Sequence, residues 1–254
     1  MLRTRVIPTL LLKDGSLVKT INFKKYNYIG DPVNTVRIFN ELEVDELIFL
    51  DIFASKNNSD INFKLLKDIA NECFMPLSYG GNIKSLDDAK KIFEIGFEKI
   101  VINSNAFDNL KLIEEIAKYF GSQSIIGSID VKKNFFGKYR IFSHHGRIKQ
   151  EKDVIIWSKK LESVGIGELF LTSIDKEGTW EGYDIELIKK VTDSVQIPVI
   201  ANGGAGSIDD IGEVAREANA SACAVGSLVV YQKKGMGVLV NFPDRKRLED
   251  AING

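Results

Sequence analysis

Two stretches of this sequence repeat each other: Gly80–Asp88 reads GGNIKSLDD, and Gly203–Asp210 reads GGAGSIDD. In both, a Gly-Gly pair follows a short apolar run. A serine then precedes an aspartate by three residues, which is the spacing of a helix capping box with Asp in place of the usual Glu. An apolar run that ends in glycines and leads into a capped helix is the repeating unit of an α/β fold.

The same register extends through the rest of the chain. Glu46-Leu-Ile-Phe-Leu50 recurs as Glu168-Leu-Phe-Leu-Thr172 at an offset of 122 (168 − 46), and Asn103-Ser104 corresponds to Gly226-Ser227 at 123 (226 − 103). RVIPTLLLKD, from Arg5, aligns with SIIGSIDVKK, from Ser124, at 119 (124 − 5). Offsets this similar predict a duplicated chain, with halves of approximately 1–120 and 121–254 in one domain that covers 1–254.

Short apolar runs alternate with amphipathic segments along both halves. The predicted strands are Val6–Leu12, Glu46–Asp51, Pro76–Tyr79, Lys99–Ile102, Ser124–Asp130, Glu168–Thr172, Pro198–Ala201 and Ser221–Val225. The predicted helices are Asp31–Leu42, Asp60–Asn71, Ser85–Ile95, Asn109–Tyr119, Asp153–Ser163, Asp184–Val191, Ser207–Glu217 and Asp244–Ala251. Eight strands that alternate with eight helices in about 250 residues fit a closed (βα)8 TIM barrel better than an open doubly wound sheet.

Two insertions interrupt this alternation, Lys13–Gly30 after the first strand and Val131–Lys152 after the fifth. The second is rich in aromatic residues and contains both histidines, so we predict a small hairpin there. His144-His145 has no third ligand at a useful spacing, and we therefore expect a polar loop tip and no metal site.

Composition excludes several classes of protein. The 254 residues include 34 basic and 35 acidic side chains, a net charge of −1 that argues against a surface for nucleic acid or anionic membrane. No stretch approaches 18 apolar residues, and the N-terminal apolar run is too short for a signal peptide. The two cysteines, Cys73 and Cys223, lie far apart, which favours a reducing compartment. We expect a soluble cytoplasmic protein.

Small and amide side chains follow four of the predicted strands, at the end where TIM barrels bind phosphate. In the first half they are Gly80, Gly81, Asn82, Asn103 and Ser104; in the second they are Gly203, Gly204, Gly226 and Ser227. A single Gly-Gly pair is more often a tight turn than a ligand site, but two copies at equivalent strand ends favour binding. They predict an elongated ligand with a phosphate at each end.

Three aspartates, Asp51, Asp130 and Asp175, fall at or just past strand ends on the same side of the barrel. A carboxylate between barrel walls can have a raised pKa and serve as a general acid. The alternative for each is an ordinary cap or loop acid. Asp130 corresponds in the repeat to Leu11, and leucine cannot transfer a proton.

The chain resembles HisF, the cyclase subunit of imidazole glycerol phosphate synthase, along nearly its whole length. The matching stretches include Lys13-Asp14-Gly15, Val18-Lys19, Asp45-Glu46-Leu47, Leu50-Asp51-Ile52, Phe120-Gly-Ser-Gln123, Leu171-Thr172-Ser-Ile-Asp175, Gly182-Tyr-Asp184 and Gly203-Gly-Ala-Gly206. The resemblance implies a HisH-type glutaminase partner whose ammonia crosses the barrel, and it implies no cofactor. It places Thr172 at the ligand and makes Lys19 a loop lysine that closes over substrate, the alternative being a solvated surface lysine.

In HisF two aspartates act as acid and base. Asp130 matches the one on the fifth strand, whereas Leu11 occupies the position of the other. Asn82, Glu177 and Asn202 also depart from the HisF pattern. Arg5–Lys13, Glu72–Pro76 and the Phe-Pro-Asp ending look instead like the WbuZ-type HisF paralogue. That paralogue implies a sugar N-amidotransferase partner and an acetamidino group formed on an N-acetyl sugar, in surface-polysaccharide or nonulosonate biosynthesis.

Four charged residues begin predicted strands at the opposite end of the barrel: Arg5, Glu46, Lys99 and Glu168. By resemblance they form the gate through which ammonia enters HisF, and two cations and two anions can neutralise one another there. A purely structural salt-bridge plug is the alternative.

The sequence therefore leads to a HisF-like barrel that passes ammonia from a glutaminase towards sugar amidation. A working imidazole glycerol phosphate synthase cyclase is the enzymatic rival, and residue 11 distinguishes the two. The rival from another class is a non-catalytic scaffold that stabilises the glutaminase.

Overall fold

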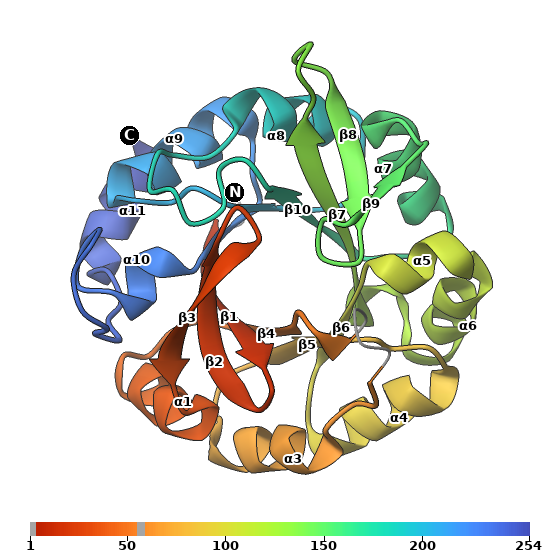
Figure 1. Ribbon diagram of the computed structural model, residues 1–254, viewed down its shortest axis with the longest axis horizontal. Coiled ribbons are helices and arrows are strands. Elements are labelled where there is room, and N and C mark those ends of the chain that lie inside the picture. Colours follow the sequence, from red (N-terminus) through yellow and green to blue (C-terminus); the bar gives the residue numbers. More distant parts are fainter. Residues whose placement is uncertain (1–3, 55–58) are drawn as a thin grey trace.

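A computed structural model of the protein describes residues 4–54 and 59–254, and within them eight parallel strands close into a barrel (Figure 1). In order around the barrel these are β1 (Arg5–Lys13), β4 (Leu47–Asp51), β5 (Leu77–Gly80), β6 (Lys99–Ile102), β7 (Ile125–Lys133), β10 (Glu168–Ser173), β11 (Val199–Asn202) and β12 (Ala222–Val225). Pairing of β1 with both β4 and β12 closes the ring. The predicted TIM barrel is confirmed.

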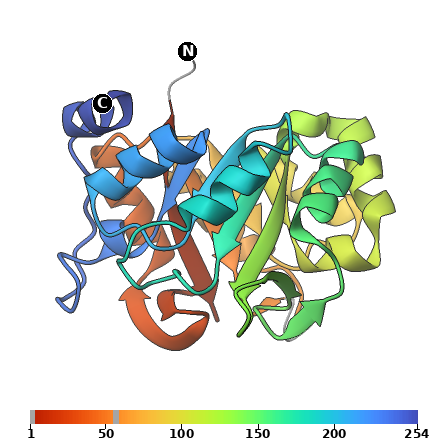
Figure 2. The ribbon, with the colours of Figure 1, turned by 90° about the horizontal axis from the view of Figure 1, so that it is seen from above.

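Helices form an outer layer around the strands (Figures 1 and 2). They are α1 (Pro32–Glu41), α3 (Phe63–Glu72), α4 (Leu86–Ile95), α5 (Ser104–Asp108), α6 (Leu110–Phe120), α7 (Val154–Ser163), α8 (Ile185–Thr192), α9 (Ile208–Ala218), α10 (Ser227–Val230) and α11 (Arg245–Asn253). A 3-10 turn spans Ser122–Ser124. No helix in the described part of the chain is both long and apolar enough to cross a membrane.

The alternation of side chains along each strand divides the apolar residues into two groups. Outward side chains of the strands, such as Phe49 and Leu169, pack against helix side chains such as Phe39, and together they form the larger core. Inward side chains form a second, smaller cluster inside the barrel: Ile7, Ile48, Val101, Ile126, Phe170, Ile200, Ala222 and Ala224. Strands buried on both faces in this way are typical of a parallel sheet covered by helices.

Both predicted capping boxes are present. The hydroxyl of Ser85 accepts a hydrogen bond from the Asp88 amide at 3.1 Å, while the Asp88 carboxylate accepts one from the Ser85 amide at 3.0 Å. Ser207 and Asp210 do the same at the start of α9, at 3.2 and 2.9 Å. The two boxes satisfy backbone amides that have no partner inside the helix, and they set the direction in which each chain leaves its glycine pair.

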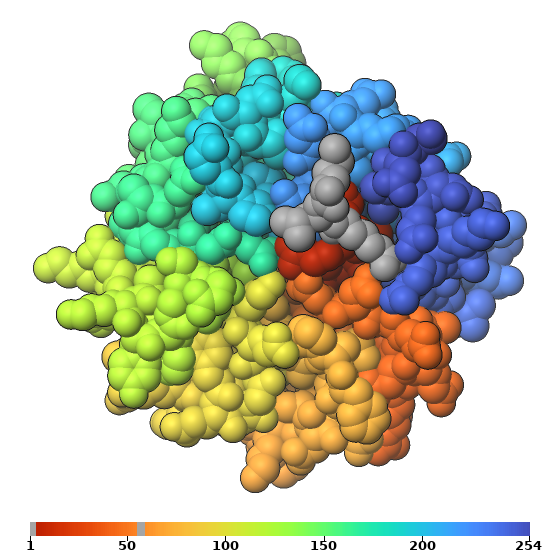
Figure 3. All heavy atoms as spheres, turned by 180° about the vertical axis from the view of Figure 1, so that it is seen from behind, coloured from red at the N-terminus to blue at the C-terminus, as the bar shows by residue number. Residues whose placement is uncertain are grey.

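Each half of the barrel begins with a long strand that continues into antiparallel partners. β1 continues into β2 (Ser16–Ile21) and β3 (Lys24–Gly30), and β7 into β8 (Tyr139–Ser143) and β9 (Ile148–Gln150). The predicted hairpin in the second insertion is therefore confirmed. Figure 1 looks onto the end of the barrel that carries both extensions, and the first residues of the barrel lie near the centre of the opposite face (Figure 3).

Most element boundaries lie within one or two residues of the prediction. The helix expected from Asp60 is an exception, because it begins at Phe63, where the Asn62 side chain caps it by accepting from the Leu65 amide at 3.0 Å. The strand expected to end at Asp130 continues to Lys133, since pairing with β8 extends it. The short helices α5 and α10 carry too little periodicity to be predicted.

Candidate functional site

A cavity of about 130 Å³ opens at the carboxyl ends of the barrel strands. Of the residues expected to contact ligand, those that line it are Lys19, Asp51, Gly81, Asn82, Asn103, Ser104, Asp130, Thr172, Gly203, Gly204, Gly226 and Ser227. Residues from both halves of the chain thus meet in one cavity. Asp175 does not line it.

Asp130 lies inside the cavity with only 7% of its surface exposed. Its Oδ2 accepts a hydrogen bond from the Asn103 side-chain amide at 2.9 Å, and Thr172 lies beside it in register on β10. Burial raises the pKa of Asp130 to about 7, although the hydrogen bonds from Asn103 and Thr172 act in the opposite direction. A carboxyl group with this pKa can hold or give up a proton near neutral pH.

Leu11 faces the same cavity from β1 and is 8% exposed. In the strand order β1 and β7 are four strands apart in either direction, so Leu11 and Asp130 belong to opposite walls of the barrel. One wall therefore presents a carboxyl group and the other an aliphatic side chain.

The other two aspartates have different surroundings. Asp51 lines the cavity, and its Oδ1 accepts from the amides of Phe53 and Ala54 at 3.1 and 2.9 Å. Burial raises the pKa of Asp51, and these two bonds oppose the rise. Asp175 is exposed, and its carboxylate accepts from the Lys133 amide at 2.8 Å, which places it beside the end of β7, where the turn of the β7–β8 hairpin begins.

The two glycine pairs are required for different physical reasons. At Gly81 a β-carbon would collide with the Tyr79 hydroxyl and with the Asp51 side chain. Gly203 and Gly204 have φ angles of +96° and +114°, a region that side chains disfavour. Short helices begin at Ser104 and Ser227, each just past the strand that follows a glycine pair in the chain. The two predicted phosphate subsites therefore lie on opposite sides of the cavity.

Lys19 extends from β2 into the cavity and is 7% exposed, so it is not a solvated surface lysine. Its Nζ lies 3.6 Å from Oε1 of Glu177 and close enough to Gly226 that a β-carbon there would collide with it. Glu177 also accepts from the Thr20 hydroxyl at 2.8 Å and from the Phe23 amide at 3.1 Å. Glu177, which departs from the HisF pattern, therefore lines the cavity, a place that the sequence alone does not predict for it.

The cavity mouth is narrowed by contact between the two extensions. Phe23, between β2 and β3, stacks on His145, between β8 and β9, with ring centroids 4.8 Å apart and planes within 7°. The Tyr26 hydroxyl lies 2.9 Å from Nε2 of His145. Phe23 and His145 both line the cavity, so His145 has a defined place there and is not merely part of a polar loop tip.

At the other end of the barrel the four predicted charged residues form a closed network, called here the charged ring. Arg5 contacts Glu46 at 2.6 Å and Glu168 at 2.7 Å. Lys99 contacts Glu168 at 2.6 Å and Glu46 at 3.7 Å. Burial alone would raise the pKa of Glu168, but Arg5 and Lys99 outweigh it and hold that pKa below its ordinary value. Between the ring and the cavity lies the apolar cluster of the barrel interior.

Comparison with known proteins agrees with this architecture. Residues 5–235 match the family described as "Histidine biosynthesis protein". The chain belongs to this family. In this chain the fold is a (βα)8 barrel with its cavity at the carboxyl ends of the strands.

Named relatives place the chain more narrowly. It is 49% identical to "Putative imidazole glycerol phosphate synthase subunit hisF2" of Pseudomonas aeruginosa, over 98% of this chain and 99% of the relative. It is 42% identical to the protein named hisF3 of Vibrio vulnificus, over 99% and 97%. "Imidazole glycerol phosphate synthase subunit HisF" of Methanococcus vannielii is 40% identical, over 92% and 93%. The chain is a member of the HisF group.

Proposed function

We propose that this chain is the HisF-like subunit of a glutamine-dependent amidotransferase. It receives ammonia from a HisH-type glutaminase at the charged ring and directs it through the barrel towards an N-acetyl sugar, on which a partner N-amidotransferase completes an acetamidino group. The observation that carries the proposal is the pairing of a complete charged ring with a cavity that has Asp130 on one wall and Leu11 on the other.

Leu11 argues against the cyclase of histidine biosynthesis. Ring closure by paired acid–base chemistry needs a group that removes a proton and another that supplies one. Asp130 can do either near neutral pH, but the side chain of Leu11 can do neither. The names of the relatives do not separate the cyclase from the amidation role, because this chain is similar both to HisF itself and to the proteins named hisF2 and hisF3.

The charged ring supports ammonia handling. Its four side chains are between 12% and 26% exposed, so a small neutral molecule that passes between them leaves water at once. Beyond them the apolar interior of the barrel favours neutral ammonia over ammonium, because a charge there would be costly to desolvate. The glycine pairs and Lys19 support an anionic, phosphate-bearing ligand at the cavity end.

Reconstitution tests this proposal. The purified chain is combined with a HisH-type glutaminase and a sugar N-amidotransferase from the same organism, and amidated sugar is measured with glutamine or with ammonium salt as the nitrogen source. We expect glutamine-dependent product only when this chain is present, and ammonium-dependent product without it. Substantial conversion of the histidine-pathway ribonucleotide by this chain and ammonia would instead establish the cyclase.

A variant of the ring separates transfer from scaffolding. Lys99→Met should lower the glutamine-dependent rate while the ammonium-dependent rate and the assembly with glutaminase stay unchanged. If glutamine-dependent product formation is unchanged in an intact assembly, the chain acts as a scaffold for the glutaminase and the transfer role fails.

A further inference from the structure

Two opposite walls of the cavity, which the repeat predicts to be alike, differ in their charged groups. The amide wall, at the ends of β5 and β6, consists of Gly81, Asn82, Asn103, Ser104 and Asn105. The lysine wall, at the ends of β11 and β12, consists of Gly203, Gly204, Gly226, Ser227 and the Lys19 side chain from β2. Because the repeat predicts a phosphate at each wall, the two walls should offer similar donors and cations.

Lys19 gives the lysine wall a cation that is committed to no hydrogen bond. Only 7% of its surface is exposed, and its Nζ makes no hydrogen bond within the described residues. Its ion pair with Glu177 is long, at 3.6 Å, and both oxygens of that carboxylate accept hydrogen bonds from other groups, Thr20 and the Phe23 amide. A buried ammonium group without hydrogen-bond acceptors is costly, so this wall favours an anion.

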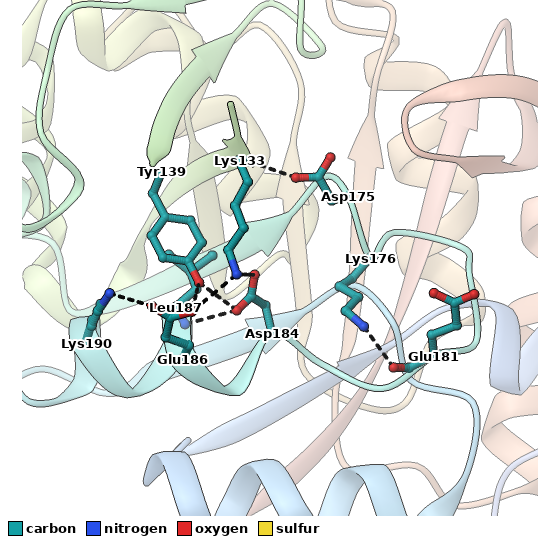
Figure 4. Close-up of polar contacts among 9 residues, drawn as sticks. All are labelled: Lys133, Tyr139, Asp175, Lys176, Glu181, Asp184, Glu186, Leu187 and Lys190. Atoms are coloured by element: carbon teal, nitrogen blue, oxygen red, sulfur yellow. Dashed lines mark hydrogen bonds and ion pairs between the residues drawn. The ribbon is translucent and has the colours of Figure 1, made fainter. Parts of the chain in front are cut away.

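The other lysine near these glycines is not part of the cavity. Lys176 lies beside Gly204, where a β-carbon would come within 3.2 Å of the Lys176 Cβ. Figure 4 shows the Nζ of Lys176 directed at the carbonyl oxygen of Glu181, to which it donates at 3.0 Å. Among the described residues that line the cavity, Lys19 is the single lysine or arginine. An anion at the lysine wall would therefore be paired with Lys19.

Two of the three side-chain amides of the amide wall support the backbone of the protein itself. Nδ2 of Asn82 donates to the Ser59 carbonyl at 2.8 Å, and Nδ2 of Asn105 donates to the Ile83 carbonyl at 2.6 Å. These bonds hold the loops that follow β4 and β5 against the ends of β5 and β6. They also reduce the number of donors that a phosphate would find at this wall.

Carboxyl groups border the amide wall on both sides. Asp51 ends β4 and lies so close to Gly81 that a β-carbon there would collide with it, while Asp130 on β7 accepts from Nδ2 of Asn103 at 2.9 Å. Oδ1 of Asn103 is buried without a donor among the described residues. Burial raises the pKa of both carboxyl groups, so negative charge is poorly solvated here. A phosphate would place further negative charge between two acids, at a wall that already has surplus acceptors.

His145 does not supply the amide wall with a cation. Its ring lines the cavity but stacks on Phe23, and its Nε2 lies 2.9 Å from the Tyr26 hydroxyl. The next residue, Gly146, faces Phe23 and Ile174, which follows β10. His145 therefore belongs to the mouth of the cavity, on the side of β10, and not to the ends of β5 and β6.

We propose that the ligand of this cavity carries one phosphate, bound at the lysine wall, and that its other end is uncharged and donates hydrogen bonds to the amide wall. A sugar monophosphate has this chemistry, because its hydroxyl and amide groups are donors. A ligand with a phosphate at each end does not. The inference rests on the proposed function, since it treats the cavity as the binding site of the sugar.

Amide NMR of the full chain, titrated with inorganic phosphate, tests where phosphate binds. We expect saturable shifts at Gly204 and Gly226, with a Kd of about 1 mM, and none at Gly81. Lys19→Met should weaken binding about tenfold, whereas Lys19→Arg should retain it. Lys176→Met is the matched control, because it removes a neighbouring lysine that does not line the cavity, and its Kd should equal that of the wild type.

A second titration counts the phosphates of an organic ligand. Glucose 6-phosphate should bind more tightly than inorganic phosphate, because its hydroxyl groups reach acceptors of the amide wall. Glucose 1,6-bisphosphate should bind no more than about twofold more tightly than glucose 6-phosphate. Far-ultraviolet circular dichroism verifies that each variant of the first titration is folded.

Each outcome decides the inference. Saturable shifts at Gly81, or a bisphosphate that binds at least about tenfold more tightly, would show that the amide wall also takes a phosphate. Equal Kd values for glucose 6-phosphate and phosphate would reject the donor-bearing end. No saturable binding up to roughly 10 mM phosphate, or an unchanged Kd in Lys19→Met, would reject the phosphate at the lysine wall.

Failure of the inference can be distinguished from failure of the proposed function. If the reconstitution yields glutamine-dependent amidated sugar while any of these contrary results is found, only the assignment of the ligand is rejected. If phosphate binds once, at the lysine wall and through Lys19, but no glutamine-dependent product forms, the proposed function is rejected and the single phosphate site remains.

Discussion

Folding brings the titration of Asp130 close to neutral pH. Its pKa rises from an ordinary 3.8 to about 7, so the folded protein binds more protons than the unfolded chain between these values. The stability that the protonated form provides is therefore complete below about pH 4 and is lost as the pH rises towards 7. Ionised Asp130 therefore lowers the free energy of unfolding.

Asp130→Asn tests this directly. The Asn side chain can still accept from Asn103, but it carries no charge. We expect the variant to gain stability relative to the wild type between about pH 4 and pH 8, by up to roughly 4 kcal/mol. Urea unfolding of both proteins across this range gives the difference. A pH-independent difference, or a carboxyl NMR titration of Asp130 near pH 4, would contradict the raised pKa.

Residues of the site differ in how far the sequence could predict them. Asn103 and the glycine pairs lie at or just past strand ends, and Asp130 lies where the barrel part of β7 passes into the hairpin. The carboxyl ends of barrel strands share one face, so the sequence predicts that these residues meet. Asp175 lies two residues past the end of β10, and its carboxylate accepts from the Lys133 amide outside the cavity. The Phe23–His145 stack joins two insertions whose directions depend on hairpin twist and packing, and no local pattern encodes these.

At the scale of elements, the charged ring connects four strands through side chains that each begin a strand or immediately precede it. Because the folded pKa of Glu168 lies below its ordinary 4.5, the stability it contributes is present above pH 4.5 and is lost as the pH falls through the folded value. Removal of its charge leaves Arg5 and Lys99 to share Glu46.

We expect Glu168→Gln to lower the free energy of unfolding at pH 7 by about 2 kcal/mol, less than a fully buried pair would lose because the ring is partly hydrated. The difference from the wild type should shrink below about pH 4.5, and urea unfolding at pH 7 and pH 4 measures it. Glu151→Gln, which breaks the exposed Lys149–Glu151 pair, is the control and should change nothing measurable. Equal effects of the two variants would show that the ring is no more than a surface ion pair.

The β7–β8 hairpin depends on Tyr139 for its attachment to α8. Burial raises the pKa of Tyr139, and its bonds to Asp184 and Glu186 add to the rise, so the hydroxyl remains a donor at every physiological pH. We expect Tyr139→Phe to lose about 1 kcal/mol of stability. Amide exchange should become faster at residues 133–139 and stay unchanged at β11, as mass spectrometry can measure. Unchanged exchange in the hairpin would mean that the backbone ladder alone holds it.

The elements themselves were more predictable than their lengths. Ser85 and Ser207 marked helix starts to the residue because a capping box is a local, two-residue signal. The sequence predicts an end of β7 at Asp130, three residues too early, because an extension by pairing with β8 has no local signal. The hydrogen bonds of a helix cap join residues within one turn of the chain, whereas the end of a strand depends on the neighbouring strand with which it pairs.

At the scale of the whole molecule, the repeat predicts that the barrel consists of two parts that could assemble from separate chains. Elements of the second half follow those of the first in the same order, including the long strands β1 and β7 and the short helices α5 and α10. The exact boundary near residues 120 and 121 remains a prediction. Either half alone would expose two unpaired parallel edges, β1 and β6 or β7 and β12, and such edges associate.

The charged ring determines which association should dominate. The first half supplies Arg5, Lys99 and Glu46, and the second supplies Glu168, so the two halves are complementary, with one net positive and one net negative charge. Two copies of the first half would bring together two net positive charges, and two copies of the second would bring two glutamates face to face without a cation. Like charges in a partly buried ring are costly.

We therefore expect chains 1–120 and 121–254, when mixed, to form a one-to-one complex in preference to either self-pair. Glu168→Gln in the second chain should weaken that complex by about tenfold to a hundredfold, and added salt should weaken the wild-type complex only modestly, because the ring is largely shielded from solvent. Analytical ultracentrifugation and native mass spectrometry measure both effects. A mixture that remains as self-pairs, or a mixed complex that tolerates Glu168→Gln, would show that strand pairing and apolar packing choose the partner without the ring.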